Sequence, residues 1–215
     1  MINVSNEKPV IMIGSGGHAA VLAEILMRQN YKIIAVCSLD EIHRKDIFNG
    51  IKHLHSNSEV LEYDNKNVQL INGLGMMPHT NQRLKVIQYF ESFDYSFGSV
   101  LDENAFISKY SQINNGVQIL ANAIVQTGSV LGSHTIINSG AIVEHDCNLG
   151  DSNHLATGSK LCGEVQTGNN VFIGAGASVI QNIKIGNNCL IAAGSILTEH
   201  LLDGMRCYPC KNILR

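Results

Sequence analysis

The sequence predicts an α/β domain followed by a parallel β-helix, and two patterns in the chain support this expectation. Over the first 98 residues or so, short apolar runs alternate with helical patterns. From residue 101 to residue 197, every sixth position is aliphatic except Thr167. A period of six matches neither an α-helix nor an isolated strand. It matches a triangular coil in which each hexad forms one side and its aliphatic residue points to the axis.

The N-terminal unit starts with an apolar run at Val10–Ile13, which is typical of a strand buried in a parallel sheet. A glycine-rich turn follows, and residues 19–29 then show the spacing of an amphipathic helix. We expect its buried face to comprise Val21, Leu22, Ile25 and Leu26. The later elements predicted for this unit are strands at Lys32–Cys37 and Val68–Gly73, a short strand near Ile51 and a helix at Gln82–Phe93. Strands and helices in this order predict a small doubly wound, Rossmann-like sheet.

We expect the second unit to be a left-handed parallel β-helix of hexapeptide repeats. Three hexads make one coil, so that residues three hexads apart stack directly above one another. Glycine recurs at a single hexad position, as expected for corners that require a positive φ; these residues are Gly116, Gly128, Gly140, Gly158, Gly176 and Gly194. The predicted domains are therefore residues 1–98 and 99–215. The flat outer faces of such a prism predict packing of three copies into a symmetric trimer.

Composition excludes several classes of function. The formal net charge of −3 means that the chain has no excess of positive charge with which to bind a nucleic acid. No apolar run is long enough to cross a bilayer, which argues against membrane insertion and favours a cytoplasmic protein. Cys207 and Cys210 form a C-x-x-C pair near the end of the chain, but a zinc knuckle needs a second pair of ligands. We therefore predict no metal.

The tripeptide Glu144-His145-Asp146 is the strongest candidate for a catalytic group. It follows the inward-facing Val143, so it falls at the end of a face and in a corner. A neighbouring carboxylate can fix the tautomer of His145 and stabilise its imidazolium, as a general base near neutral pH requires. Gly163 lies three hexads after His145, and its backbone N–H could face a developing oxyanion. A solvated surface histidine is the alternative interpretation.

His154 lies half a coil beyond His145, which places the two side chains roughly 15 Å apart within one chain at ~3.3 Å per residue. They could act together only across an interface between subunits. In the first unit, the turn with Gly14, Gly16 and Gly17 precedes a helix, where backbone N–H groups attract a pyrophosphate. The turn could hold a dinucleotide cofactor, a nucleotide sugar or no ligand.

Two neighbouring residues extend this candidate site. His18 follows the turn at the start of the helix, where it is either a capping-region residue or a ligand-binding residue. Asp40 lies near the end of the second predicted strand, where an acid that binds a ribose is expected.

The glycine-rich G-x-G-G-H turn and the I-V-E-H-D segment within the hexads together resemble the bacterial sugar O-/N-acyltransferases. This family includes sialic acid O-acetyltransferases and nucleotide-linked 4-amino-sugar N-acetyltransferases. The resemblance implies a homotrimer, acetyl-CoA as the acetyl donor, and active sites between adjacent β-helices. It also implies that Gly14, Gly16, Gly17, His18 and Asp40 form a nucleotide-sugar cleft.

The same resemblance implies roles for residues of the β-helix. His145 corresponds to the proposed general base, and Asp146 to the acid that supports it, which is a glutamate in some relatives. Asn138 matches a residue of the acceptor pocket, His154 matches a contact to acetyl-CoA, and Gly163 matches a backbone donor to the acetyl carbonyl.

The preferred hypothesis is an acetyl-CoA-dependent N-acetyltransferase acting on the 4-amino group of a nucleotide-activated deoxyamino sugar. An O-acetyltransferase acting on a sugar hydroxyl, such as that of sialic acid, is the alternative within the same class. An alternative of another class is a non-catalytic, nucleotide-binding trimeric scaffold. The sequence does not decide between UDP and dTDP sugars.

Overall fold

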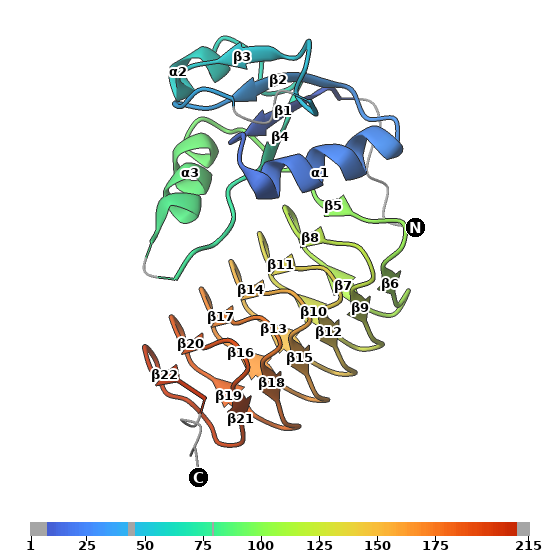
Figure 1. Cartoon of the computed structure of the whole chain (residues 1–215), viewed down its shortest axis with the longest axis vertical. Coiled ribbons are helices and arrows are strands. Elements are labelled where there is room, and N and C mark those ends of the chain that lie inside the picture. The colour runs from blue at the N-terminus through green and yellow to red at the C-terminus, as the bar shows by residue number, and fades with distance from the viewer. Residues whose placement is uncertain (1–7, 43–45, 79, 210–215) are drawn as a thin grey trace. The chain divides into compact units, whose positions relative to one another are not determined.

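The computed structural model of the chain describes residues 8–42, 46–78 and 80–209. It contains two compact units, which divide between Val100 and Leu101. The first unit is an α/β domain and the second is a parallel β-helix (Figure 1). The predicted fold class is therefore confirmed. Within the described ranges, no helix combines the length and apolar character that a membrane span requires.

The first unit is a four-stranded parallel sheet flanked by helices. Its strands follow the order β3-β2-β1-β4, so the chain moves outward through three strands and then returns to the other side of β1. The elements are β1 (Val10–Ile13), α1 (Gly17–Arg28), β2 (Ile33–Cys37), β3 (Lys52–Leu54), α2 (Asn57–Val60), β4 (Gln69–Asn72) and α3 (Gln82–Glu91).

Burial explains why these segments form these elements. The β1 strand is apolar throughout, because both faces of a central parallel strand are covered. The α1 helix buries Leu22, Ile25 and Leu26, which are spaced for one face. Val21, which we assigned to that face, is 42% exposed and lies outside it. The helix is followed by Asn30 with φ 62°, a left-handed conformation that asparagine tolerates.

The second unit contains one two-residue strand for each predicted hexad, and the second residue of every strand from β5 to β21 belongs to the aliphatic series or is Thr167. These strands are β5 (Val100–Leu101), β6 (Phe106–Ile107), β7 (Gln112–Ile113), β8 (Gln118–Ile119), β9 (Ile124–Val125), β10 (Val130–Leu131), β11 (Ile136–Ile137), β12 (Ile142–Val143), β13 (Asn148–Leu149), β14 (His154–Leu155), β15 (Lys160–Leu161), β16 (Gln166–Thr167), β17 (Phe172–Ile173), β18 (Ser178–Val179), β19 (Lys184–Ile185), β20 (Leu190–Ile191) and β21 (Ile196–Leu197), with β22 (Arg206–Cys207) after them.

Strands stack in three parallel sheets with a register of three hexads, as the pairing of Ile136 with His154 and of His154 with Phe172 shows. Successive coils are visible as rungs from β5 to β22 in Figure 1. The aliphatic series fills the interior, and most of its members are fully buried. The final coil is two residues shorter than the others. Leu190 pairs with Arg206, whereas a full coil of three hexads would pair it with Tyr208.

Thr167 interrupts the aliphatic series because it belongs to a buried polar network. Its Oγ1 accepts a hydrogen bond from Asn153 Nδ2 at 2.6 Å. Asn153 is 1% exposed, and its Nδ2 also lies 3.0 Å from the carbonyl oxygen of Gly168. A buried amide requires polar partners, so a hydroxyl at the inward position stabilises this coil better than a methyl group would.

Candidate active site

The His145 corner is built by the end of one strand and the turn that follows it. Val143 ends β12 and is fully buried in the core, so the chain must leave the face immediately after it. Asp146 then adopts φ 58°, the left-handed conformation of a corner residue. Its backbone N–H donates to the carbonyl oxygen of Thr127 on the preceding coil at 3.0 Å. Coil stacking thereby fixes the backbone that carries His145.

His145 and Asp146 form a hydrogen-bonded pair in which Nδ1 lies 2.9 Å from Oδ2. Because a carboxylate can only accept, the neutral imidazole carries its hydrogen on Nδ1 and leaves Nε2 as an acceptor. The two side chains are 54% and 61% exposed, so solvent and substrates can reach them within this chain.

The surroundings of the imidazole favour its protonated form. The hydrogen bond to Asp146 raises the pKa of His145 above its ordinary value, and the negative charges of Asp146, Glu144 and Glu164 act in the same direction. Partial desolvation opposes them but does not reverse the shift. His145 is therefore a stronger base than a free histidine, which suits proton abstraction.

Gly163 lies against the imidazole ring, one coil after His145. A Cβ atom on Gly163 would lie 2.6 Å from both Cε1 and Nε2 of His145, so only glycine allows this approach. The coils are locked together here by a hydrogen bond of 2.9 Å from the Glu164 N–H to the His145 carbonyl oxygen. Within the described ranges, no hydrogen bond uses the Gly163 N–H. The backbone of Gly163 therefore passes close to Nε2 of His145.

Asn138 and His154 form a second group. Asn138 Nδ2 lies 3.3 Å from His154 Nε2, and Asn138 Oδ1 accepts from the Ser139 N–H at 2.8 Å. His154 is 7% exposed, and its ring lies edge-on to Phe172 with centroids 5.2 Å apart. These contacts thus join the predicted β-helix residues in two groups, one around His145 and one around His154.

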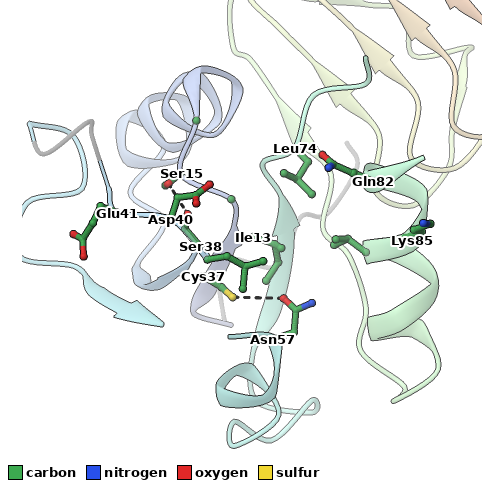
Figure 2. Close-up of a pocket in the computed structure, with 14 residues that line it drawn as sticks. Ile13, Ser15, Cys37, Ser38, Asp40, Glu41, Asn57, Leu74, Gln82 and Lys85 are labelled. Atoms are coloured by element: carbon green, nitrogen blue, oxygen red, sulfur yellow. Dashed lines mark hydrogen bonds between the residues drawn. The ribbon is translucent and has the colours of Figure 1, made fainter. Parts of the chain in front are cut away.

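A cleft of about 870 Å³ lies at the carboxyl edge of the sheet in the first unit (Figure 2). This volume is within the range of small-molecule sites, and the edge beside the strand-order reversal is where α/β sheets bind ligands. Ser38 and Asp40 lie on one side of the cleft, and Gln82 and Lys85 lie on the other. The lining residues are Ile13, Gly14, Ser15, Gly16, Cys37, Ser38, Leu39, Asp40, Glu41, Asn57, Leu74, Gln82, Lys85 and Val86.

Three of the five residues predicted for this cleft line it, namely Gly14, Gly16 and Asp40. Gly14 has φ +100°, and its N–H donates to the carbonyl oxygen of Cys37 at 2.7 Å, so the turn is tied to β2. Gly17 and His18 instead begin α1 and are not among the described residues that line the cleft. His18 lies beside Gly75, because a Cβ atom added to Gly75 would be 3.8 Å from the Cβ atom of His18.

The sequence did not single out Ser38, Asn57, Gln82 or Lys85, although all four line the cleft. They come from the end of β2 and from the starts of α2 and α3. The hydroxyl of Ser38 accepts from that of Ser15 at 2.9 Å, which connects the glycine-rich turn to the chain after β2. The only feature of the sequence that points to these four lining residues is that they follow strands. The carboxyl ends of parallel strands meet at one edge of a sheet, so residues after the strands gather there.

The described part of the chain contains no group of three or more His, Cys, Asp or Glu residues that could hold a metal ion. Cys207 lies on β22 and forms no disulfide with any other cysteine that the structure describes. Cys210, its partner in the C-x-x-C pair, lies outside the described residues.

Two parts of the chain match family models. Residues 9–90 match the PglD N-terminal domain, and residues 164–199 match the bacterial transferase hexapeptide repeat. A comparison with curated proteins gives no match.

Solved structures resemble nearly the whole chain. PerB from Caulobacter crescentus, in complex with CoA and GDP-perosamine, is 27% identical over 91% of both chains, with a TM-score of 0.80. A mutant of perosamine N-acetyltransferase from the same organism, also with CoA and GDP-perosamine, is 26% identical over 92% of both chains, with a TM-score of 0.82. The acetyltransferase domain of PglB from Neisseria gonorrhoeae FA1090 is 25% identical over 93% of this chain and 95% of that one, with a TM-score of 0.80.

The matches to acetyltransferase structures extend over both units and identify this chain as an acetyltransferase. The family models and these structures together support a bacterial sugar acetyltransferase built on hexapeptide repeats.

Proposed function

We propose that this protein transfers an acetyl group from acetyl-CoA to the 4-amino group of a nucleotide-activated deoxyamino sugar. The observation that carries the proposal is the His145–Asp146 pair, whose basic nitrogen lies beside the bare backbone of Gly163. The related PerB, which binds CoA and GDP-perosamine, supports this choice of donor and acceptor.

In the proposed reaction, His145 Nε2 accepts a proton from the amine as the amine attacks the thioester carbonyl carbon. Asp146 holds the imidazole in the required tautomer and stabilises the imidazolium that forms. The carbonyl electron pair moves to oxygen and then returns, which breaks the C–S bond and releases CoA as a thiolate. The proton held by His145 then passes to that thiolate or to water. A general base of this kind contributes about 10²–10⁴-fold to the rate.

Gly163 supplies the second element of this mechanism. Its N–H would donate to the oxyanion that develops on the acetyl carbonyl, and such donors are effective because they are already oriented. A glycine is required here by the contact with His145, so one residue both admits the base and provides the donor. No acyl-enzyme is needed, because a neutral amine is itself a good nucleophile.

We assign the nucleotide portion of the acceptor to the first unit. The turn from Gly14 to Gly16 leads into α1, which begins at Gly17, and the N–H groups at a helix start favour a diphosphate. Asp40 lines the same cleft after β2, where a carboxylate can bind a ribose hydroxyl. His18 adjoins this turn at the start of α1 and belongs to the same proposed site.

We further propose a cytoplasmic homotrimer with active sites between subunits. In this arrangement Asn138 contributes to the acceptor pocket and His154 contacts the thioester end of acetyl-CoA. Their mutual hydrogen bond would keep both side chains in fixed orientations. The cytoplasm is where acetyl-CoA and nucleotide sugars are both available.

The test is an acetyl-transfer assay with His145→Ala and a panel of acceptors. The wild-type protein should acetylate at least one of a UDP-, a dTDP- and a GDP-linked 4-amino sugar, and the variant should lose about 10²–10⁴-fold in kcat with that acceptor. Gln181→Ala is a matched control, since Gln181 is exposed and occupies the position equivalent to His145 two coils later. Turnover of sialic acid without turnover of any amino sugar would favour the O-acetyltransferase. Failure to bind acetyl-CoA in calorimetry would favour a non-catalytic scaffold.

A further inference from the structure

Gly128 lies on the coil preceding Asp146 and contacts its carboxylate. A Cβ atom placed on Gly128 would lie 2.2 Å from Asp146 Oδ1 and 3.2 Å from its Cγ. The carboxylate therefore occupies the space that any side chain at residue 128 would fill. The stacking that brings them together is fixed by the hydrogen bond from the Asp146 N–H to the carbonyl oxygen of Thr127.

His145, the other member of the pair, also contacts a glycine. The His145 ring lies against Gly163 on the following coil, and the Asp146 carboxylate lies against Gly128 on the preceding coil. The hydrogen bond of 2.9 Å between Nδ1 and Oδ2 therefore joins two side chains that are each confined by a bare backbone. Neither side chain could keep its position if its glycine carried a methyl group.

A second corner glycine, Gly116, also contacts a side chain on the following coil. A Cβ atom on Gly116 would lie 2.4 Å from Nδ1 of His134, which has φ 60° and stands one coil later. By contrast, a Cβ atom on Gly176 would meet nothing within 4 Å, although Gly176 has φ +66°. The contact at Gly128 therefore depends on which side chain lies on the next coil and is not a general property of the corner glycines.

From this geometry we propose that Gly128 is a positioning residue for the acetyl transfer, acting through Asp146. It provides the space that lets the carboxylate turn back over the preceding coil and reach His145. This inference rests on the proposed function of His145 as the base. A side chain at residue 128 would push the carboxylate away, and His145 would lose the partner that fixes its tautomer.

The test compares Gly128→Ala with Gly176→Ala. Both variants place alanine at a positive φ and so share the same backbone strain. We expect Gly176→Ala to keep wild-type kcat within about twofold. Gly128→Ala should lower kcat by about tenfold or more and move the acidic limb of its pH–rate profile to lower pH, with KM for acetyl-CoA unchanged. A wild-type pH profile in Gly128→Ala would overturn the proposal.

A double-mutant cycle with Asp146→Asn separates this inference from the proposed function. If Gly128 acts through Asp146, adding Gly128→Ala to Asp146→Asn should change kcat by less than about twofold. A further loss equal to that of Gly128→Ala alone would show that Gly128 acts independently and would overturn the inference. If Asp146→Asn itself leaves the pH–rate profile unchanged, the proposed role of the His145–Asp146 pair fails instead.

A stability measurement keeps the proposal testable if Gly128→Ala does not fold. Removal of the carboxylate by Asp146→Gly should remove the clash. The Gly128→Ala/Asp146→Gly and Gly176→Ala/Asp146→Gly proteins should then have Tm values within about 2 °C of each other. A much lower Tm for the first protein would mean that residue 128 meets something other than the Asp146 carboxylate, and the proposal would be wrong.

Discussion

The buried amide of Asn153 offers the clearest test of how the β-helix is held together. Its Oδ1 accepts from the Val171 N–H at 2.6 Å, and its Nδ2 lies 3.0 Å from the Gly168 carbonyl oxygen and 2.6 Å from Thr167 Oγ1. The side chain thus links its own coil to the next one. Substitution by leucine, which has a similar volume, would leave the Val171 N–H and the Gly168 carbonyl without this partner.

Each buried main-chain group that loses its partner costs about 1.5 kcal/mol, so Asn153→Leu should destabilise the protein by about 3 kcal/mol. For a chain of this size, that corresponds to a fall in Tm of about 6–12 °C. The assay is thermal unfolding followed by circular dichroism.

Ser159→Ala is the matched control for this substitution. Ser159 is fully buried, and its Oγ has no hydrogen-bond partner among the residues that the structure describes. Its removal should leave Tm unchanged or slightly higher. A Tm for Asn153→Leu within about 2 °C of the wild type would refute the role assigned to the network.

Two further substitutions test the candidate site. Gly163→Ala should lower kcat by about tenfold or more with little change in Tm, because the new methyl group would displace the exposed ring of His145. An unchanged kcat would contradict the contact between this glycine and the base. Asp40→Ala should raise KM for the nucleotide sugar by about tenfold and leave kcat within about twofold, because it removes a hydrogen bond to the ribose. If initial-rate kinetics show no change in KM, the ribose lies elsewhere.

The β-helix could be predicted almost completely from the sequence, because its geometry repeats. A period of six fixes which residues point inward, and the three-hexad register then places Gly163 beside His145. Corner positions follow from the same repeat, so the left-handed conformation of Gly128 and of Asp146 was open to prediction. The repeat does not predict the hydrogen bonds of the Asn153 side chain, since its partners are determined by side-chain packing within the coils.

The first unit was less predictable, because its site is assembled from separate segments. The polar stretch after Asp40 contains β3 and α2, of which only a short strand near Ile51 was expected. Consequently Asn57 could not be placed at the cleft from the sequence. Gln82 and Lys85 were correctly expected on a helix, but their orientation toward the cleft depends on how α3 packs against the sheet.

The pH dependence of kcat in the wild type and in Asp146→Asn tests the central claim most directly. The base must be neutral to accept a proton, so kcat should rise with pH through the pKa of His145, which Asp146 raises above its ordinary value. Loss of the carboxylate lowers that pKa, and the half-maximal point of the acidic limb should therefore move to lower pH. An acidic limb at the same pH in both proteins would contradict the assignment of His145, held by Asp146, as the base.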